Sequence, residues 1–255
     1  MIRALACLVL LLAAAPAPPA PNTPLPIDSA RIVRTLPHDP AAFTEGLFYR
    51  DGFLYESTGQ VGESSIRKVD LLTGKVLRSV TVPPPYFGEG IAPVGRQIVS
   101  LTWQHHIGFR WSLDGFRKLG QFSYPGEGWA LTTDGTAVIM SDGTAQLRFL
   151  DPATMKERRR ITVTVNGRPL DQLNELEYVD GEILANIWRT RFIARIDPTD
   201  GHIIGLIDLS ALIATVAATD PEAVPNGIAW DEKGRHLYVT GKEWPSLFEI
   251  SPPKG

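Results

Sequence analysis

A degenerate fivefold repeat predicts an all-β fold for this chain of 255 residues. Each copy opens on a side-chain carboxylate or amide, and four of the five copies follow it with glycine. The opening residues lie 38 to 52 positions apart, close to the roughly 40–50 residues of a four-stranded propeller blade. They are Glu45, Glu89, Glu127, Asn174 and Asn226.

A tight turn and a second apolar run follow each opening segment. Asp51-Gly52, Asp134-Gly135 and Asp180-Gly181 lie between apolar runs, and such a dipeptide is the strongest short-range signal of a β-hairpin. Gly95-Arg96 and Lys233-Gly234 occupy the corresponding places in the other two copies. The repeat therefore predicts that every copy starts with two paired strands.

A third strand and an outer strand complete each unit. Residues 76–80 have the pattern of such an outer strand. The last copy runs out after Ser251 and lacks one, which we expect residues 30–36 to supply. Closing the ring in this way removes a free sheet edge. The sequence thus predicts a five-bladed β-propeller closed by an N-terminal strand, with an open β-sandwich as the alternative.

The opening residues of the five copies are expected to form a polar ring. In a propeller, the first strand of every blade lines the central channel, so equivalent residues meet at one mouth of it. Three carboxylates close together repel, and a raised pKa, a bound cation or a nearby lysine relieves the repulsion. The ring is therefore a candidate for acid–base chemistry or for metal binding.

The second strands are expected to end near the same rim, where aromatic and basic residues follow them. Trp103, Trp188 and Lys242 come 14, 14 and 16 positions after the opening residues of their blades. Gln104 is the neighbour of Trp103, and Trp129 directly follows the third Glu-Gly pair. The shared register across blades predicts a pocket with indole walls.

Composition and motifs exclude several classes of function. The formal charge is −3 and no basic run exceeds residues 158–160, which argues against a nucleic-acid partner. The five histidines lack zinc-ligand spacing, and the chain has no nucleophile elbow, P-loop or dinucleotide fingerprint. We expect the histidines to have structural or surface roles.

The N-terminus has the pattern of an export signal. Arg3 precedes an unbroken apolar run over residues 4–15, and a Pro/Ala-rich stretch follows to residue 26. We predict a signal peptide and leader over residues 1–26, with an uncleaved anchor as the alternative. Cleavage removes Cys7, the only cysteine, and leaves a thiol-free periplasmic or secreted chain without stable membrane association.

The remaining residues, 27–255, are predicted to form a single catalytic domain. Only residues 205–220 break the repeat, and within them residues 209–218 read as a short helix inserted into a loop.

Seven ordered motifs resemble those of a known family. They are FTEGL at 43–47, FGEGI at 87–91, LTW at 101–103, GEGW at 126–129, LNELE at 173–177, ANIW at 185–188 and VTGK at 239–242. Together they resemble the plant and bacterial glutaminyl cyclases, or glutaminyl-peptide cyclotransferases, over about residues 30–251. That family consists of five-bladed propellers and is unrelated to the zinc-dependent animal glutaminyl cyclases.

The resemblance implies a reaction. N-terminal glutamine of a peptide or protein becomes pyroglutamate when its α-amine attacks the γ-carboxamide carbon and ammonia leaves. No metal or other cofactor is implied for catalysis, although a structural cation in the channel is left open. The closed ring has no spare edge, which favours a monomer.

The resemblance also assigns roles to residues. Glu89 is the expected acid–base, Lys242 and Asn174 would bind or polarise the γ-carboxamide, and Glu45 would bind the α-ammonium or share the proton transfer. Plant members usually have Gln at the position of Glu45, so the division of roles between Glu45 and Glu89 is open. The expected substrate-binding residues are Phe43, Trp103, Gln104, Glu127, Trp129, Asn174 and Trp188.

Two other functions compete with this one. A calcium-dependent propeller lactonase or related hydrolase would use Glu45, Asn174 and Asn226 as oxygen ligands, but such proteins normally have six blades. A non-enzymatic binding propeller is the third hypothesis, and it would not need ionisable groups clustered around a lysine.

Overall fold

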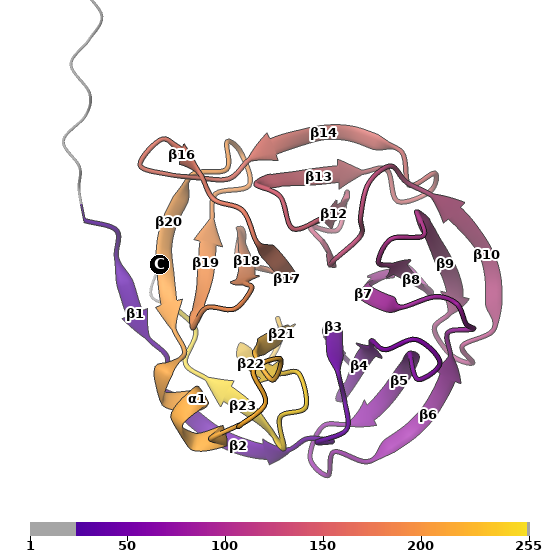
Figure 1. The fold of residues 1–255 in the computed structure, drawn as a ribbon, viewed down its shortest axis with the longest axis horizontal. Helices are drawn as coiled ribbons and strands as arrows, with labels where there is room; N and C mark the ends of the chain where they lie inside the picture. The colour runs from indigo at the N-terminus through magenta and orange to yellow at the C-terminus, as the bar shows by residue number, and fades with distance from the viewer. Residues whose placement is uncertain (1–23, 254–255) are drawn as a thin grey trace, which may run out of the picture.

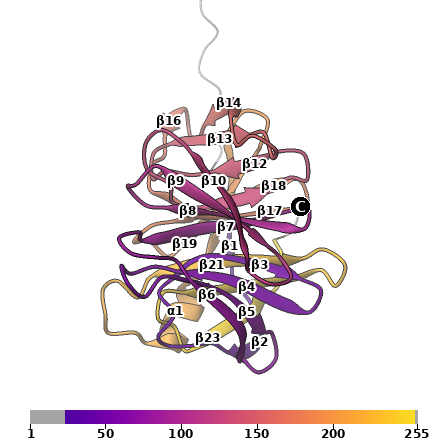
Figure 2. The same ribbon diagram turned by 90° about the vertical axis from the view of Figure 1, so that its right-hand side faces the viewer.

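The computed structural model describes residues 24–253, which form a ring of five sheets around a central channel (Figure 1). Seen from its edge, the ring is a stack of strongly twisted sheets (Figure 2). The predicted signal segment falls largely on residues 1–23, outside the described residues. No helix among residues 24–253 is long and apolar enough to cross a membrane.

The blades follow one another in chain order, and adjacent strands within each blade are antiparallel. The first blade comprises β3 (Thr44–Arg50), β4 (Phe53–Thr58), β5 (Ser65–Asp70) and β6 (Val76–Thr81). The second comprises β7 (Gly88–Val94), β8 (Gln97–Thr102), β9 (Ile107–Ser112) and β10 (Lys118–Ser123). The third comprises β11 (Leu131–Thr133), β12 (Val138–Met140), β13 (Gln146–Leu150) and β14 (Glu157–Thr162).

The last two blades have additions. The fourth comprises β17 (Leu173–Val179), β18 (Glu182–Ile187), β19 (Phe192–Ile196) and β20 (Ile203–Asp208), with β1 (Ile27–Ser29) added parallel to β20. The fifth comprises β21 (Pro225–Asp231), β22 (His236–Gly241), β23 (Ser246–Ile250) and β2 (Ile32–Pro37). A small hairpin, β15 (Thr164–Val165) and β16 (Arg168–Pro169), lies between the third and fourth blades.

The predicted closure of the ring is confirmed. β2 pairs antiparallel with β23, with Thr35 opposite Phe248. Just after β2, the buried His38 ring bonds the Glu56 carboxylate through Nε2 at 2.9 Å and the Trp244 carbonyl through Nδ1 at 2.6 Å. This histidine joins the first and last blades at their seam, in keeping with its expected structural role. The strand β1 was not predicted.

In every blade, the innermost strand is more buried than the outermost strand. The first five residues of β3 and of β7 are buried, whereas no residue of the outer strands β6 and β10 is. The core lies between blades, where apolar side chains of both β-sheet faces interdigitate, as Phe48 and Ile66 do with Ile91 and Phe109. Strands buried on both faces account for the apolar runs that follow the opening residues of the first, second and fifth copies.

The glycine after the opening carboxylate of the first two blades lets the first strands approach closely. A Cβ atom on Gly46 would lie 2.6 Å from the backbone nitrogen of Ile91, and one on Gly90 would lie 2.3 Å from the Cα of Ala130. Any side chain there would push neighbouring blades apart at the channel. The Glu-Gly pairs of the first two blades thus have a packing cause.

Replacing Gly90 with Ala is expected to destabilise the ring by about 1–3 kcal/mol, the usual cost of overpacking. Gly120 lies on the outer strand β10, where a Cβ atom would have no other atom within 4 Å. Gly120→Ala is therefore the matched control and should change the free energy of unfolding by less than about 0.5 kcal/mol. Urea unfolding measures both variants. Equal effects of the two substitutions would contradict the packing argument.

The predicted helix is present as α1 (Ser210–Val216), slightly shorter than residues 209–218. Leu212 is fully buried, and the helix ends at Ala217, which has a left-handed backbone conformation. The loop that follows, residues 218–224, leads into β21 and reaches the channel mouth, as described below.

Candidate active site

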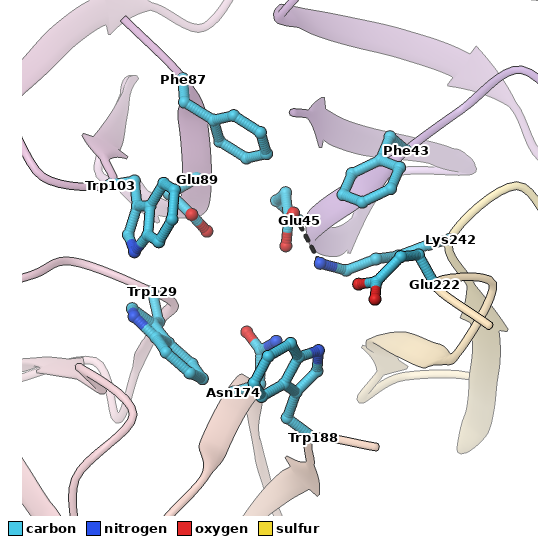
Figure 3. Close-up of a pocket in the computed structure, with 10 residues that line it drawn as sticks. All are labelled: Phe43, Glu45, Phe87, Glu89, Trp103, Trp129, Asn174, Trp188, Glu222 and Lys242. Atoms are coloured by element: carbon cyan, nitrogen blue, oxygen red, sulfur yellow. Dashed lines mark hydrogen bonds and ion pairs between the residues drawn. The ribbon is translucent and has the colours of Figure 1, made fainter. Parts of the chain in front are cut away.

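A cavity of about 220 Å³ opens at one mouth of the channel, and all five blades contribute to its wall (Figure 3). This volume is below the roughly 300–1,000 Å³ of pockets for drug-sized ligands, so the cavity fits one amino-acid side chain. Eight of the ten predicted site residues line it. The lining residues are Phe43, Glu45, Phe87, Glu89, Trp103, Trp129, Asn174, Trp188, Glu222 and Lys242.

The ends of the second strands supply three of the walls, as predicted. Trp103, Trp188 and Lys242 are each the first residue after β8, β18 and β22. Each backbone N–H donates to a carbonyl two residues before the opening residue of its own blade: Phe87, Gln172 and Val224 accept at 3.1, 2.8 and 3.0 Å. One backbone geometry, repeated around the ring, therefore aims three side chains at the cavity.

Glycine stands at the corresponding register in the other two blades and leaves room for aromatic rings: Gly59 directly follows β4, and Gly143 lies three residues beyond Met140, as Trp103 lies three beyond Ser100. A Cβ atom on Gly59 would lie 2.5 Å from the Phe87 ring, and one on Gly143 would lie 2.5 Å from the Trp129 ring. The Phe43 and Phe87 rings meet edge to face at 6.2 Å between centroids, as do Trp129 and Trp188 at 5.6 Å. The walls of the cavity are thus mutually packed aromatics.

A buried ion pair lies at the base of the cavity. The Lys242 ammonium is 2.7 Å from Oε1 of Glu45, and the two side chains are only 7% and 3% exposed. The Asn226 amide donates to the other Glu45 oxygen at 3.1 Å. Burial raises the pKa of the Glu45 carboxyl, and the Lys242 charge opposes that rise. With both oxygens accepting donors, Glu45 is the carboxylate that carries the negative charge here.

Glu89 is the buried carboxyl beside this pair, and it is 6% exposed. Burial, then the charge of Glu45, raises its pKa well above the usual range, against the opposing effect of Lys242. No described residue forms a hydrogen bond with the Glu89 carboxyl, which faces the cavity (Figure 3). A carboxyl in this setting keeps its proton to higher pH than an exposed carboxyl does, and it can exchange that proton with a group that enters the cavity.

The predicted polar ring is wrong in the third blade. Leu131 pairs with Met140 as Ile91 pairs with Ser100, so the counterpart of Glu89, two residues before Ile91, is Trp129 and not Glu127. Asn226 keeps its place in the ring but lies beneath Glu45, outside the lining of the cavity. The Glu-Gly pair of the third copy has the same residues as the motif of the first two copies, but it lies two residues before the equivalent position.

Glu127 instead binds the indole N–H groups of two tryptophans that line the cavity. Its Oε2 accepts the indole N–H groups of Trp103 at 2.7 Å and Trp129 at 2.9 Å, and its Oε1 accepts the Gln104 amide at 3.0 Å. Neither Glu127 nor Gln104 lines the cavity. Against the effect of partial burial, these hydrogen bonds lower the pKa of Glu127, so it stays ionised and keeps accepting from both indoles.

A sequence model of the glutamine cyclotransferase family matches residues 4–251. The chain belongs to this family. The resemblance found in the seven motifs is thereby confirmed.

Two proteins similar to this glutamine cyclotransferase family member have names that agree with the family assignment. A glutaminyl-peptide cyclotransferase from Arabidopsis thaliana is 43% identical over 228 residues, which cover 88% of this chain and 71% of the plant protein. The crystal structure of Myxococcus xanthus glutaminyl cyclase matches with a TM-score of 0.84 and 36% identity, over 89% of this chain and 97% of the other. The WD40 β-propeller domain of Doa1, at 12% identity and a TM-score of 0.50, shares the propeller fold alone.

Glu45 of this glutamine cyclotransferase family member is a poor ligand for calcium. Both oxygens of Glu45 already accept from Lys242 and Asn226, so the ammonium takes the place that a cation would need. Within residues 24–253, the one cluster of acidic and imidazole groups close enough to share an ion is Asp197, Asp200 and His202. It lies in the turn between β19 and β20, away from the cavity.

Two lining residues were missed by the sequence analysis. Phe87 stands two residues before Glu89 as Phe43 stands two before Glu45, so the repeat contained the signal. Glu222 belongs to the loop after α1, outside the repeat, and no pattern in the sequence marks it.

Proposed function

We propose that this protein is a glutaminyl-peptide cyclotransferase that converts N-terminal glutamine of peptides or proteins into pyroglutamate and releases ammonia. The observation that carries the proposal is an unpartnered buried carboxyl, Glu89, next to the Glu45–Lys242 pair at the base of an aromatic cavity that fits one side chain. Membership of the glutamine cyclotransferase family supports it.

The bond changes are simple, so positioning and proton transfer are the main tasks. The α-nitrogen bonds to the Cδ atom of the glutamine side chain, and the bond from Cδ to the amide nitrogen breaks. The two protons that the α-ammonium loses end on the departing nitrogen, which leaves as ammonium. Glu89 takes the first proton as a base and returns it to the leaving nitrogen as an acid.

Lys242 and Asn174 would receive the γ-carboxamide oxygen as its negative charge develops. The Lys242 ammonium is fixed by Glu45 at 2.7 Å, so it needs little reorganisation when the substrate enters. Glu45 in turn places a negative charge where the substrate α-ammonium must come. The aromatic walls hold the side chain folded back toward its own amine and exclude water, which raises the effective concentration of the nucleophile.

The pH dependence of kcat/KM should report Glu89. As a base, Glu89 must be ionised, and its pKa is raised well above 4.5, so activity is expected to rise with pH through a limb displaced from that value toward neutrality. A second limb should reflect the substrate α-amine, whose pKa is about 7.7–8. Measurement of kcat/KM against pH with a neutral glutaminyl dipeptide tests this, and an acid limb at 4.5 or below would contradict it.

Glu127 should act on substrate binding through the indoles. Glu127→Gln replaces a carboxylate with a group that accepts on one atom only, and bonds to charged acceptors contribute about 1.5–3 kcal/mol when well ordered. Because Glu127 is partly exposed, we expect KM to rise by about tenfold with a smaller change in kcat, and the tryptophan emission to shift. Unchanged KM and emission would show that Glu127 does not hold the walls.

The direct test of the function is ammonia release from glutaminyl dipeptides, with and without EDTA. We expect turnover that EDTA does not change, because the proposed chemistry uses side chains only. EDTA-sensitive turnover of a lactone, with no ammonia from glutaminyl peptides, would favour the calcium-dependent hydrolase. Export after cleavage within residues 1–26, action as a monomer and peptides with a free N-terminal glutamine as partners belong to the same proposal.

A further inference from the structure

Glu222 is the one charged lining residue at the entrance of the cavity. The other three ionisable lining residues, Glu45, Glu89 and Lys242, are buried at the base, whereas the Glu222 side chain is 41% exposed. Figure 3 shows its carboxylate directed toward the space that the lining residues enclose, on the side of the view where Lys242 lies. Glu222 therefore faces whatever part of a substrate remains outside the cavity.

The loop that carries Glu222 is fixed to the loop that carries Lys242. The backbone N–H of Lys242 donates to the Val224 carbonyl at 3.0 Å, and the Trp244 indole N–H donates to the Ala223 carbonyl at 2.9 Å. Within the loop, Asp220 accepts the backbone N–H of Glu222 at 2.8 Å. Glu222 is thus held in place by the wall of the site.

Among the described residues, Arg189 is the one cation that pairs with Glu222. The Arg189 guanidinium forms an ion pair with its carboxylate and lies over the Trp188 ring, 4.4 Å from its centre. Arg189 is 58% exposed and does not line the cavity. The carboxylate is therefore the member of the pair nearer to the substrate, and the arginine is the member farther away.

Within the cavity lining, no unpaired cation offsets Glu222. Lys242, the only cation among the lining residues, is paired with Glu45. Across the cavity, Glu127 stands behind Trp103 and Trp129 and its lowered pKa keeps it ionised. A cationic group at the entrance would meet Glu222 first, and an anionic group would be repelled by it.

We propose that Glu222 and Arg189 select the second residue of the substrate peptide, with Glu222 favouring a cationic side chain there over an acidic one. This inference rests on the proposed function: the cavity takes the glutamine side chain, so the next residue lies at the entrance. Glu222 is a specificity-determining residue in this scheme, and Arg189 moderates its charge.

The experiment compares kcat/KM for the amides of Gln-Lys and Gln-Glu in each variant, at low ionic strength. The ratio of the two values is internal to a variant, so a general loss of activity cancels. We expect wild type to favour Gln-Lys, Glu222→Gln to reduce the ratio by about three- to fivefold, and Arg189→Gln to increase it. High salt should reduce the wild-type ratio. Glu63→Gln, an exposed carboxylate after β4 that does not line the cavity, is the matched control and should leave the ratio unchanged.

Opposite shifts separate charge selection from a structural role. If the Glu222–Arg189 ion pair only joined two loops, either substitution would break it. Both variants would then change the kcat/KM ratio in the same direction or not change it. Either of those results overturns the inference while ammonia release from Gln-Ala by wild type still upholds the function. Absence of ammonia from Gln-Ala with the wild-type protein overturns both.

Discussion

Glu89→Gln is expected to lower kcat/KM for a glutaminyl dipeptide by about 10²–10⁴-fold, the usual contribution of a positioned acid–base group. The amide keeps the size of the side chain but cannot take the proton of the α-ammonium or return it to the departing nitrogen. The acid limb of the pH profile should disappear as well, because the group that produces it is gone.

The same substitution should not harm the fold. Burial raises the folded-state pKa of Glu89, so ionisation of this group opposes folding as the pH rises through that pKa, and a neutral amide removes the opposition. The urea midpoint at neutral pH is therefore expected to equal or exceed that of wild type. Glu177 is the control: it lies on the inner strand β17 and is partly buried, burial raises its pKa to about 8, and it does not line the cavity, so Glu177→Gln should retain activity in the folded protein. Full activity of the Glu89→Gln variant would contradict the proposed mechanism.

The Glu45–Lys242 pair should give the largest stability effects. Glu45→Gln leaves a buried ammonium without its charge partner, and Lys242→Met leaves a buried carboxylate without its own. Breaking a buried pair from one side costs roughly 3–5 kcal/mol, and the lower end is expected because both groups border a cavity. The double variant removes both charges and should cost less than the sum of the single variants.

Urea unfolding of the two single variants and the double variant measures this coupling. An interaction energy of about 0.5–3 kcal/mol is expected for charged groups in contact, and additive costs would show that the pair is not coupled. Enzyme kinetics provide a second measurement: Lys242→Met should lower kcat because the γ-carboxamide oxygen loses its nearest cation. A thermal or urea comparison alone would not reveal that loss.

The fold could be predicted from the sequence because its determinants are local and repeated. Each Asp-Gly turn, each Glu-Gly or Asn-Gly pair and each apolar run recurs at blade length, and the missing outer strand of the last blade left residues 30–36 as the natural candidate. The strand β1 was missed because its partner β20 is parallel and distant in sequence. Three residues of ordinary composition give no signal for such a pairing.

Site residues that occupy a repeated position in the blades could be predicted from the sequence, and site residues outside the repeat could not. Trp103, Trp188 and Lys242 share one backbone position, which their spacing had already indicated. Glu127 was misplaced because its Glu-Gly pair copies the motif.

The distance to the following turn gives only a partial guide to the register. The opening residues of the first, second and fourth blades lie six or seven positions before the glycine of their turn, as Trp129 does at six, whereas Glu127 lies eight before it. Asn226 also lies eight before its glycine, because the turn of the fifth blade is longer, with Asp231 paired to His236. Strand pairing, which fixes the turn length, is therefore needed to tell Trp129 from Glu127.

The remaining features depend on contacts between distant segments. The orientation of Glu127 behind two indoles, the bonds of Glu45 to Lys242 and Asn226, and the entry of Glu222 from an inserted loop each join residues that no local pattern relates. These contacts, rather than the residue types alone, separate the ionised Glu45 from the unpartnered Glu89.

The most direct test of the account is mass spectrometry of a peptide with N-terminal glutamine after incubation with the wild-type protein, with ammonia measured in the same sample. The account predicts one ammonia for each peptide converted to pyroglutamate, and no conversion when the α-amine is acetylated, since the nucleophile is then blocked. Recovery of the unmodified peptide without ammonia, from protein shown to be folded, would contradict it.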